Sequence, residues 1–592
     1  MTFATNTRGD TSTRLKVWSA LGVLGLALPA CGGGDTPDNP GTGGGDGGTH
    51  TAAGKGGSAS GSGGSGATMN GGSGGSSAGK SSGGSGGQAA GTGGSNASGG
   101  AGAGAMGGSG PAGMGGTGGG GGGRGPMGGS DAGGMGPGGK AGGGGAGAGA
   151  GGGGGAGVLG PGLTDVSGLT PASCTITPMV TPASKIPTVG VATFTTDLAG
   201  ATGAIIQFGK TTTYTLEAPV EWAAADHLTW LLGMPANTDV HYRVVVLAGS
   251  SACVGPDATY KTGALSGAPA NQTPTKGSGT PAPGFIIAES GSSAYIVNRE
   301  GEVVWSYKTP LMSLSRALMS WDGKYMYARE VGPFNASSGG SIYRVAMDGT
   351  GETKLPVTGG THHDVVATPT GIAYPAKQTA GACDCIFTAG ADGSNSKCLV
   401  DLDVVFGKFQ EGPGSASMEK CHVNAIRYYK DTDSYSVSDR EKDAIAFISA
   451  KGEVLGSVGA TPTGTTPNHA KAEGADSTSS STWRVQHGHD LYEPNKLVLW
   501  SNGSFQGGMS KVLHYTISGA TASLDWQYSA AGNSPTFSDA QHLPNGNFLV
   551  TNSQSGAVHE IDASAKLVVS YPSLSKGYSQ HRSTLYGPPP GR

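Results

Sequence analysis

Residues 538–552, SDAQHLPNGNFLVTN, contain the pattern that decides the fold of the C-terminal half of this chain. Two runs suited to β-strands flank a Pro-Asn-Gly sequence, which is typical of a tight turn between antiparallel strands. Two further strand-like runs follow at 557–562 and 567–571. The segment therefore predicts one four-stranded antiparallel unit, and self-similarity at about 40–50 residues would indicate a repeat architecture.

The same unit recurs along the chain, starting near residues 316, 362, 422 and 490. A sixth unit is divided between the ends of this region, because 285–306 hold three strand-like runs and 580–586 would supply the missing first strand. Closing a ring of sheets in this way hides their edges, which otherwise invite pairing with other chains. We therefore expect an all-β chain with a six-bladed β-propeller over residues 284–592.

Residues 163–265 precede the repeats and contain short β-rich runs between turn residues. The sequence LGMPANTDVHYRV at 232–244 resembles the Leu-x-x-Pro…Thr…Tyr-x-Val pattern of fibronectin type III domains, in which Tyr242 would form a tyrosine corner with the preceding turn. We expect a small fibronectin type III-like β-sandwich here. A linker rich in Pro, Gly, Thr, Ser and Ala, residues 266–283, joins it to the propeller.

The N-terminal part has the composition of an exported and tethered protein. Residues 32–162 are mostly Gly, Ser, Ala and Thr, and they include most of the 115 glycines, so they cannot bury enough apolar area to fold and are expected to form a long disordered linker. Residues 1–31 combine basic side chains with an apolar run too short to span a membrane, as in a signal peptide. The run ends in Leu-Pro-Ala-Cys31, which resembles a lipobox, and Gly32 then suggests the outer membrane. An ordinary secretory signal cleaved nearby is the alternative.

Six cysteines remain after Cys31, and an even number in an exported chain favours disulfides. Cys174 and Cys253 bracket the predicted sandwich and are expected to pair. The other four allow three pairings, among which the sequence does not choose, and a zinc site built from all four is the alternative. These four are Cys383, Cys385, Cys398 and Cys421.

Histidines recur at one phase of the repeat, where each unit begins its first strand. The first strand of every propeller blade lines the central channel, so these side chains are expected to converge on one funnel at its mouth. Arg440 ends the second strand of its unit, which returns to the same rim. The rim set is His362, His363, His422, Asn424, His487, His489 and Ser538. Histidines outside this phase, and aspartates 364, 490 and 539 at one register, are interpreted as structural.

The order of these motifs resembles that of the bacterial arylsulfate sulfotransferase family over roughly residues 170–590. His422 and Asn424 form its His-x-Asn pair, and Arg440 follows Asn424 by sixteen residues, as in that family. A Gln-His pair ending at His487 resembles the family's nucleophile motif. The resemblance implies an exported enzyme that moves a sulfuryl group from a phenolic sulfate ester to a phenolic acceptor through a covalent sulfo-histidine. It implies no nucleotide donor, no cofactor and no metal.

The resemblance also implies roles for the rim residues. His487 would be the nucleophile, with His489 as the alternative, because Gly488 and His489 intervene before the Asp that normally follows directly. The sulfuryl oxygens would be held by Arg440, Asn424 and His422, and His362 or His363 would act as acid and base or as a further donor. Fixed donors in a sheltered funnel suit a transition state that spreads negative charge over oxygen atoms.

Other functions stay open at this point. The net charge of −4 and the lack of a basic cluster give no indication of nucleic acid as a partner. A non-catalytic, surface-tethered propeller that binds glycans or partner proteins is the main alternative to the enzyme. A hydrolase or lyase acting on acidic sugars is a weaker one.

Overall fold

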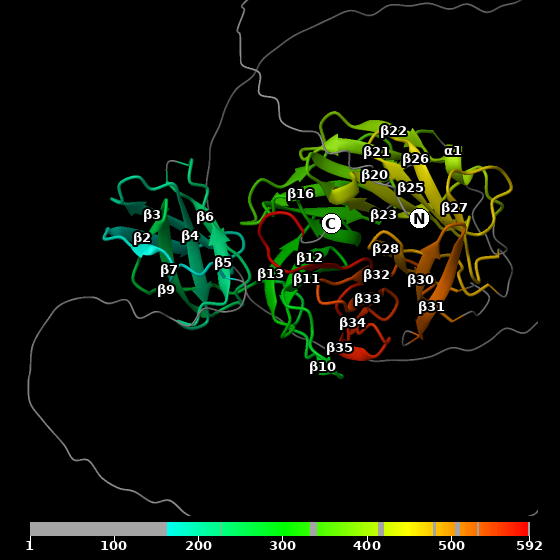
Figure 1. The fold of residues 1–592 in the computed structure, drawn as a ribbon. Coiled ribbons are helices and arrows are strands. Elements are labelled where there is room, and N and C mark those ends of the chain that lie inside the picture. Colours follow the sequence, from blue (N-terminus) through cyan, green and yellow to red (C-terminus); the bar gives the residue numbers. More distant parts are fainter. Residues whose placement is uncertain are drawn as a thin grey trace, which may run out of the picture. The chain divides into compact units, whose positions relative to one another are not determined.

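The computed structural model describes residues 163–589, with gaps at 225, 332–339, 380, 412–419, 477–480, 504–508 and 530–531. The signal peptide, the lipobox with Cys31 and the Gly-rich linker lie outside these residues. The described chain is almost entirely β-structure (Figure 1), and its helical segments are α1 (Asp403–Phe406) and the 3-10 turn η1 (Lys430–Thr432). None of the helices in these described ranges has the length and apolar character needed to cross a bilayer.

A β-sandwich forms the first described domain, as predicted. One sheet contains β2 (Ile176–Pro182), β3 (Gly190–Thr196) and β6 (Thr229–Leu231). The other contains β1 (Thr170–Pro171), β8 (Ser251–Val254), β7 (Asp239–Ala248), β4 (Gly203–Gly209) and β5 (Leu216–Pro219) in that order, with β9 (Ala258–Lys261) also paired to β7. Alternate residues of the facing strands, among them Phe194, Ile206 and Val244, fill the space between the sheets.

Two sequence predictions for the sandwich have different outcomes. The disulfide between Cys174 and Cys253 is present. Tyr242 is buried in β7, but its ring packs edge-on against Tyr260, with 6.0 Å between ring centroids. Within the described residues the Tyr242 hydroxyl makes no hydrogen bond to the preceding turn, so the tyrosine-corner contact is not formed.

Six antiparallel units of at least four strands follow the sandwich and form the six blades of a propeller, which confirms the predicted fold. From the inner to the outer strand, blade 1 contains β36 (Gln580–Arg582), β11 (Phe285–Ser290), β12 (Ser293–Asn298) and β13 (Val303–Lys308). Blade 2 contains β14 (Leu314–Met319), β15 (Tyr325–Glu330), β16 (Ile342–Ala346) and β17 (Thr353–Lys354). Blade 3 contains β18 (Gly360–Thr361) and β19 (Val366–Thr368), both on β20 (Gly371–Lys377), and then β21 (Asp384–Gly390) and β22 (Lys397–Asp401).

The remaining blades keep the same order. Blade 4 contains β23 (Val423–Tyr429), β24 (Ser434–Asp439), β25 (Ala444–Ser449) and β26 (Val454–Gly459). Blade 5 contains β28 (His489–Tyr492), β29 (Lys496–Ser501), β30 (Lys511–Ser518) and β31 (Thr521–Ser529). Blade 6 contains β32 (Asp539–His542), β33 (Phe548–Asn552), β34 (Ala557–Ile561) and β35 (Leu567–Tyr571).

The ring closes between the two ends of the propeller sequence. β36 pairs antiparallel with β11, and Ile287 lies opposite Gln580 in this register. The C-terminal segment therefore supplies the inner strand of the first blade, as predicted. In blade 6, the predicted turn after β32 is present, and Gly546 adopts a φ of 85° there, which glycine tolerates without a steric penalty.

Two strands of the described propeller region lie outside the predicted four-stranded units. β10 (Thr275–Lys276), inside the segment expected to be a plain linker, pairs with β35 and covers the outer edge of blade 6. β27 (His469–Ala472) lies parallel to both β26 and β31, so it joins blades 4 and 5 into one continuous sheet. Both strands cover edges that would otherwise expose unpaired backbone groups.

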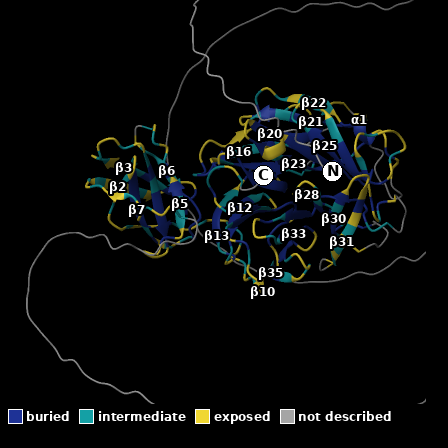
Figure 2. Ribbon diagram, in the orientation of Figure 1, coloured by how far each residue is buried: buried dark blue, intermediate teal, exposed yellow. Residues whose placement is uncertain are grey.

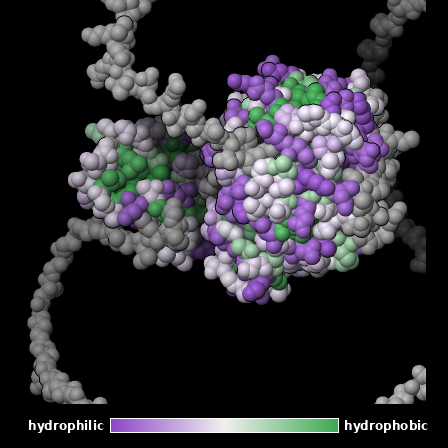
Figure 3. Space-filling view, turned by 45° about the vertical axis from the view of Figure 1, so that its right-hand side comes forward, coloured by the Kyte–Doolittle hydropathy of each residue, from purple (hydrophilic) through white to green (hydrophobic). Residues whose placement is uncertain are grey.

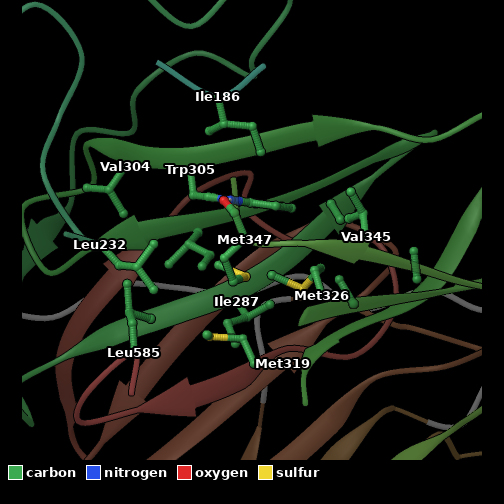
Figure 4. Close-up of a cluster of buried hydrophobic side chains, with 14 of the residues drawn as sticks. Ile186, Leu232, Ile287, Val304, Trp305, Met319, Met326, Val345, Met347 and Leu585 are labelled. Carbon is green, nitrogen blue, oxygen red and sulfur yellow. The ribbon is translucent and has the colours of Figure 1, made fainter. Parts of the chain in front are cut away.

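The core lies between the blades, where the strands are buried and the connecting loops are exposed (Figure 2). A cluster around Trp305, Met319 and Met347 fills the space between blades 1 and 2 (Figure 4), and the Trp305 indole donates a hydrogen bond to the Met347 carbonyl at 2.7 Å. Burying each such side chain contributes about 1.5–3 kcal/mol. On the face shown in Figure 3, the propeller carries mostly hydrophilic and near-neutral side chains, whereas apolar side chains gather in a patch on the sandwich.

Candidate functional site

The rim histidines come from three consecutive blades. His362 and His363 lie in the break between β18 and β19 of blade 3, and His422 directly precedes β23 of blade 4. His487 lies just before β28 of blade 5. Because these segments begin the inner strands, the propeller brings the side chains to one place at its mouth, as predicted from their phase in the repeat.

The break in blade 3 gives His363 an unusual backbone. Its φ is 55°, and the Asp364 amide donates back to the His362 carbonyl at 2.7 Å, so the chain turns sharply between two short strands. A non-glycine residue in this region costs roughly 1 kcal/mol or more, and such strain is concentrated at functional sites. The turn directs the two neighbouring imidazoles, which an uninterrupted strand would point to opposite faces, into one cluster.

Three imidazoles are in mutual contact in this cluster. The ring centroids lie 4.6 Å apart for His362 and His363, 4.7 Å for His362 and His422, and 4.9 Å for His363 and His422. The Nε2 atoms of His363 and His422 are 2.9 Å apart, so one ring donates a hydrogen bond to the other. The His363 ring also contacts that of His487, at 5.8 Å between centroids.

His487 is oriented by a side-chain amide. Its Nδ1 lies 2.6 Å from Oδ1 of Asn502, while Nδ2 of Asn502 donates to the carbonyls of Ser534 and Phe537. Those two donor bonds fix the amide so that Oδ1 can only accept. The Nδ1 atom of His487 therefore carries the proton, and the lone pair of the neutral ring is on Nε2.

Burial keeps the imidazoles of His363, His422 and His487 neutral. Burial, together with the charge of Arg440, lowers the pKa of His487 to about 3. The pKa of His363 and that of His422 are also well below the usual value, because both rings are desolvated and both face the His362 ring. Neutral imidazoles are nucleophiles and proton acceptors, so the cluster is prepared for both kinds of chemistry at neutral pH.

His489 does not join the cluster. It is the first residue of β28, it is buried, and its Nε2 lies 2.7 Å from the Ser436 hydroxyl in blade 4. Gly488 separates the two histidines because a Cβ atom there would lie 2.0 Å from Oδ1 of Asp539. Of the two candidates that the sequence left open, the geometry therefore brings His487, and not His489, to the other rim residues.

Arg440 and Asn424 lie at the same rim. The Arg440 amide donates to the His422 carbonyl at 3.0 Å, and its guanidinium pairs with Glu441. Its positive charge contributes to the low pKa of both His422 and His487. Asn424 is buried in β23 and donates to the Gln486 carbonyl at 2.6 Å, so it links blade 4 to the backbone just before His487.

Ser538, the last member of the predicted rim set, has a different role. Its hydroxyl oxygen lies within hydrogen-bond distance of the hydroxyls of Ser534 and Ser553, at 2.8 and 3.2 Å. Its carbonyl accepts a hydrogen bond from the Gly488 amide. Ser538 therefore supports the backbone beside His487 and does not contact the imidazole cluster.

Two further cations lie near the cluster, and neither belongs to the predicted rim set. Arg329 is the penultimate residue of β15, donates to the Ser315 hydroxyl and the Thr361 carbonyl, and contributes to the low pKa of His363. Lys377 ends β20, donates to the Cys421 carbonyl at 2.8 Å, and contributes to the low pKa of His422. The sequence held a signal for both residues, because each lies within one residue of the end of the second strand of its blade, as Arg440 does.

An aromatic ring borders the histidines. The Phe537 ring lies 5.2 Å from that of His363 and 6.2 Å from that of His487, between centroids. It also contacts Tyr578 edge-on at 5.8 Å. The site thus combines polar imidazoles with an apolar surface.

A buried network of charges lies next to the site. Arg427 pairs with Asp364 and with Asp539, and Arg316 is also close to both carboxylates, at 3.5 Å and 3.2 Å. Asp364 and Asp539 also accept backbone amides, from Val365 at 2.9 Å and from Ala540 at 3.0 Å. The structural role predicted for the two aspartates is therefore confirmed, and the ion pairs extend it across blades 2, 3, 4 and 6.

The cysteine arrangement excludes the zinc alternative. Cys383 pairs with Cys421, and Cys385 pairs with Cys398. Cys421 directly precedes His422, so the first of these disulfides joins blade 3 to blade 4 beside the cluster. Three nitrogen ligands do lie within reach of one ion, because ligand atoms of His362, His363 and His422 are all within 4.8 Å of one another.

Comparisons with known proteins assign neither a family nor an activity to this chain. No family model matches the sequence, and no curated protein matches it. Solved structures that it resembles include a Bacteroides fragilis protein assigned as a 6-phosphogluconolactonase, with 14% identity, a TM-score of 0.31, and coverage of 52% of this chain and 83% of that one. Another is an inactive variant of virginiamycin B lyase from Staphylococcus aureus, with 12% identity and a TM-score of 0.30. That match covers 51% of this chain and 87% of the lyase. A third is an auxiliary nutrient binding protein from Bacteroides thetaiotaomicron, with 8% identity and a TM-score of 0.29. That match covers 68% of this chain and 86% of the binding protein.

Proposed function

We propose that this protein is an aryl-sulfate sulfotransferase, which moves a sulfuryl group between phenolic oxygens through a covalent intermediate on His487. The observation that carries this proposal is the orientation of His487. Asn502 holds the proton on Nδ1, and the Nε2 lone pair belongs to a ring that contacts His363 and lies in the field of Arg440. A buried neutral imidazole with a fixed tautomer is a suitable nucleophile.

The first half-reaction balances without a metal or a nucleotide. Nε2 of His487 attacks sulfur, the bond between sulfur and the phenolic oxygen breaks, and the electron pair leaves with that oxygen. A proton taken up from solvent passes to the phenolate through the pair formed by His363 and His422, and each ring receives one proton as it gives up another, so both stay neutral. In the second half-reaction the same pair removes the proton of an acceptor phenol, whose oxygen attacks sulfur and restores His487.

The surrounding charges support this chemistry. A sulfate monoester carries a negative charge on its non-bridging oxygens, and cations held around them stabilise its transfer. Arg329, Lys377 and Arg440 provide three such cations, one from each of three consecutive blades. Phe537 supplies an apolar ring beside His487, which suits an aryl group.

We also propose that the protein is exported and is anchored by a lipid on Cys31 to the outer membrane, facing the periplasm or the cell surface. The three disulfides support export, because such bonds persist in oxidising compartments. The fibronectin type III-like identity of the sandwich belongs to the same proposal, and its two packed sheets support it.

The test is turnover of a chromogenic aryl sulfate in the presence of a phenol. The wild-type chain is expected to release the chromogenic phenol and to form the new sulfate ester. His487→Ala is expected to abolish release, whereas His489→Gln retains it. Mass spectrometry after exposure to the donor alone is expected to find one sulfuryl group on the peptide that contains His487. Binding of the aryl sulfate without release or adduct would instead favour the non-catalytic binding propeller.

A further inference from the structure

The three clustered histidines have the composition and spacing of a metal-binding set. Ligand atoms of His362, His363 and His422 lie within 4.8 Å of one another, and they come from two adjacent blades. In a tetrahedral zinc site with metal–nitrogen bonds of about 2.0–2.1 Å, the ligand nitrogens are about 3.3 Å apart. The Nε2 atoms of His363 and His422, at 2.9 Å, need to separate by only a few tenths of an ångström.

His362 has the support that metal-binding histidines usually have. Its Nδ1 lies 2.7 Å from the Val423 carbonyl oxygen, which can only accept a hydrogen bond. The proton of the neutral ring is therefore on Nδ1, and the lone pair is on Nε2. Donation of the second ring N–H to a backbone carbonyl is the arrangement that orients imidazole ligands in metal sites.

The other two rings can present Nε2 as well. His363 and His422 share one proton across their Nε2 atoms. Nδ1 of His363 has no hydrogen-bond partner among the described residues, so the protein does not hold that ring in one tautomer. A shift of the shared proton to Nδ1 of the donor ring leaves a lone pair on Nε2 of each of the three rings.

The ligand types select the class of ion. The set contains no carboxylate, so magnesium and calcium, which take oxygen ligands, are disfavoured. The nearby cysteines are oxidised and supply no thiolate. Imidazole nitrogens suit zinc, cobalt, nickel and copper.

The positive side chains nearby disfavour the binding of a divalent cation, but two of these side chains are already paired with carboxylates. Lys377 lies 3.4 Å from Asp384, and Arg440 pairs with Glu441. With three nitrogen ligands, one tetrahedral position is left for water or an anion, and an anion there would offset the remaining charge.

We propose that His362, His363 and His422 bind one divalent ion of the zinc class, with water or a small anion as the fourth ligand. This binding does not depend on sulfuryl transfer. Only the expected effect on turnover rests on the proposed function. The ion would coordinate the imidazoles that the transfer reaction uses, so zinc would inhibit turnover in competition with the aryl sulfate.

The experiment uses the full chain, stripped with a chelator and free of any histidine tag, titrated with CoCl₂ and with ZnCl₂ in chloride buffer. One equivalent of Co²⁺ is expected to give the visible absorption of a tetrahedral site, and Zn²⁺ is expected to displace it, whereas MgCl₂ is not. His362→Gln is expected to weaken Co²⁺ binding at least tenfold. His489→Gln, which removes a buried rim histidine outside the set, leaves binding unchanged.

The outcomes separate this inference from the proposed function. Absence of a tetrahedral Co²⁺ spectrum in the wild-type chain overturns the metal site, even if the protein transfers sulfuryl groups. Equal binding by the wild type, His362→Gln and His422→Gln also overturns it. If the His362 variant fails to fold, nitrogen hyperfine couplings from three imidazoles in the Cu²⁺-loaded wild type support the site, and couplings from fewer contradict it. A three-imidazole site in a protein without sulfotransferase activity leaves the inference standing.

Discussion

Nδ1 of His487 donates to Oδ1 of Asn502 at 2.6 Å, and the Asn502 amide is itself held by two backbone carbonyls of the following loop. The pairing joins the start of the inner strand of blade 5 to the end of the strand beside it. Asn502 therefore acts as a positioning residue, since it sets which nitrogen of His487 carries the lone pair.

Replacing Asn502 by Ala is expected to lower kcat for aryl sulfate turnover by about 100-fold, because a misplaced nucleophile loses the attack geometry. KM is expected to change little, since the cations that hold the anion stay in place. Steady-state kinetics check this. Asn552→Ala is the matched control, because Asn552 ends the second strand of blade 6 and its side chain bonds the local turn. An equal loss of kcat in both variants would contradict the positioning role.

Acid is expected to destabilise the fold through the buried imidazoles. The pKa of His487 is about 3 in the folded protein, below the unfolded value of about 6.5. Below pH 6.5 the unfolded chain therefore binds a proton that the folded chain does not, and stability falls as the pH drops toward 3. At pH 5 this loss is on the order of 2 kcal/mol for His487 alone.

The measurement compares denaturant unfolding at pH 7 and pH 5 for the wild type and His487→Asn. Burial raises the pKa of Asp439 and that of Asp443 to about 7, and these two carboxyl groups act in the opposite direction over the same range. The difference between the two proteins isolates His487, and the variant is expected to lose less stability on acidification. Identical losses would show that His487 already carries a proton in the fold.

Gly488 is expected to tolerate no side chain. A Cβ atom there would lie 2.0 Å from Oδ1 of Asp539, whose carboxylate is fixed by Arg427. Gly488→Ala is therefore expected to destabilise the protein by about 1–3 kcal/mol or more, as overpacking of a filled interior does. Gly203→Ala is the control, because nothing lies within 4 Å of the added atom and the φ there is ordinary. Thermal unfolding of both variants checks the prediction, which fails if they lose the same stability.

The repeat and the ring closure could be predicted because local patterns determine them. The turn at Gly546 and the alternation of the flanking strands recur in each unit, and a missing inner strand had to come from the C-terminus. By contrast, β10 and β27 are two and four residues long, and their pairing depends on which edges are left open after the blades assemble. No local pattern encodes that.

The candidate site, like the fold, could be predicted only where the repeat pattern determines it. The phase of the repeat was enough to bring His363, His422 and His487 together, because an inner strand has only one end at the mouth. The choice between His487 and His489 needed the packing of Gly488 against Asp539, which comes from another blade. The cysteine pairing likewise depends on which strands become neighbours, and spacing along the chain carries no such information.

The disulfide between Cys383 and Cys421 is expected to matter for the site, whereas the one between Cys385 and Cys398 is not. Cys421 directly precedes His422, and its carbonyl accepts from Lys377 of blade 3, so the first bond ties the segment that carries the imidazole to the blade that carries this cation. The second bond joins β21 and β22 within blade 3. Removing the first crosslink frees the segment before β23 and misplaces His422 relative to His363.

The double variant Cys383→Ser, Cys421→Ser is expected to lose about 100-fold in kcat, by the same loss of geometry as in Asn502→Ala. The double variant Cys385→Ser, Cys398→Ser keeps activity within a few-fold, although each loses about 2–4 kcal/mol of stability with its crosslink. Kinetics well below both unfolding temperatures separate the two effects. Equal activity in the two proteins, both folded by circular dichroism, would show that His422 keeps its place without the bond between the blades.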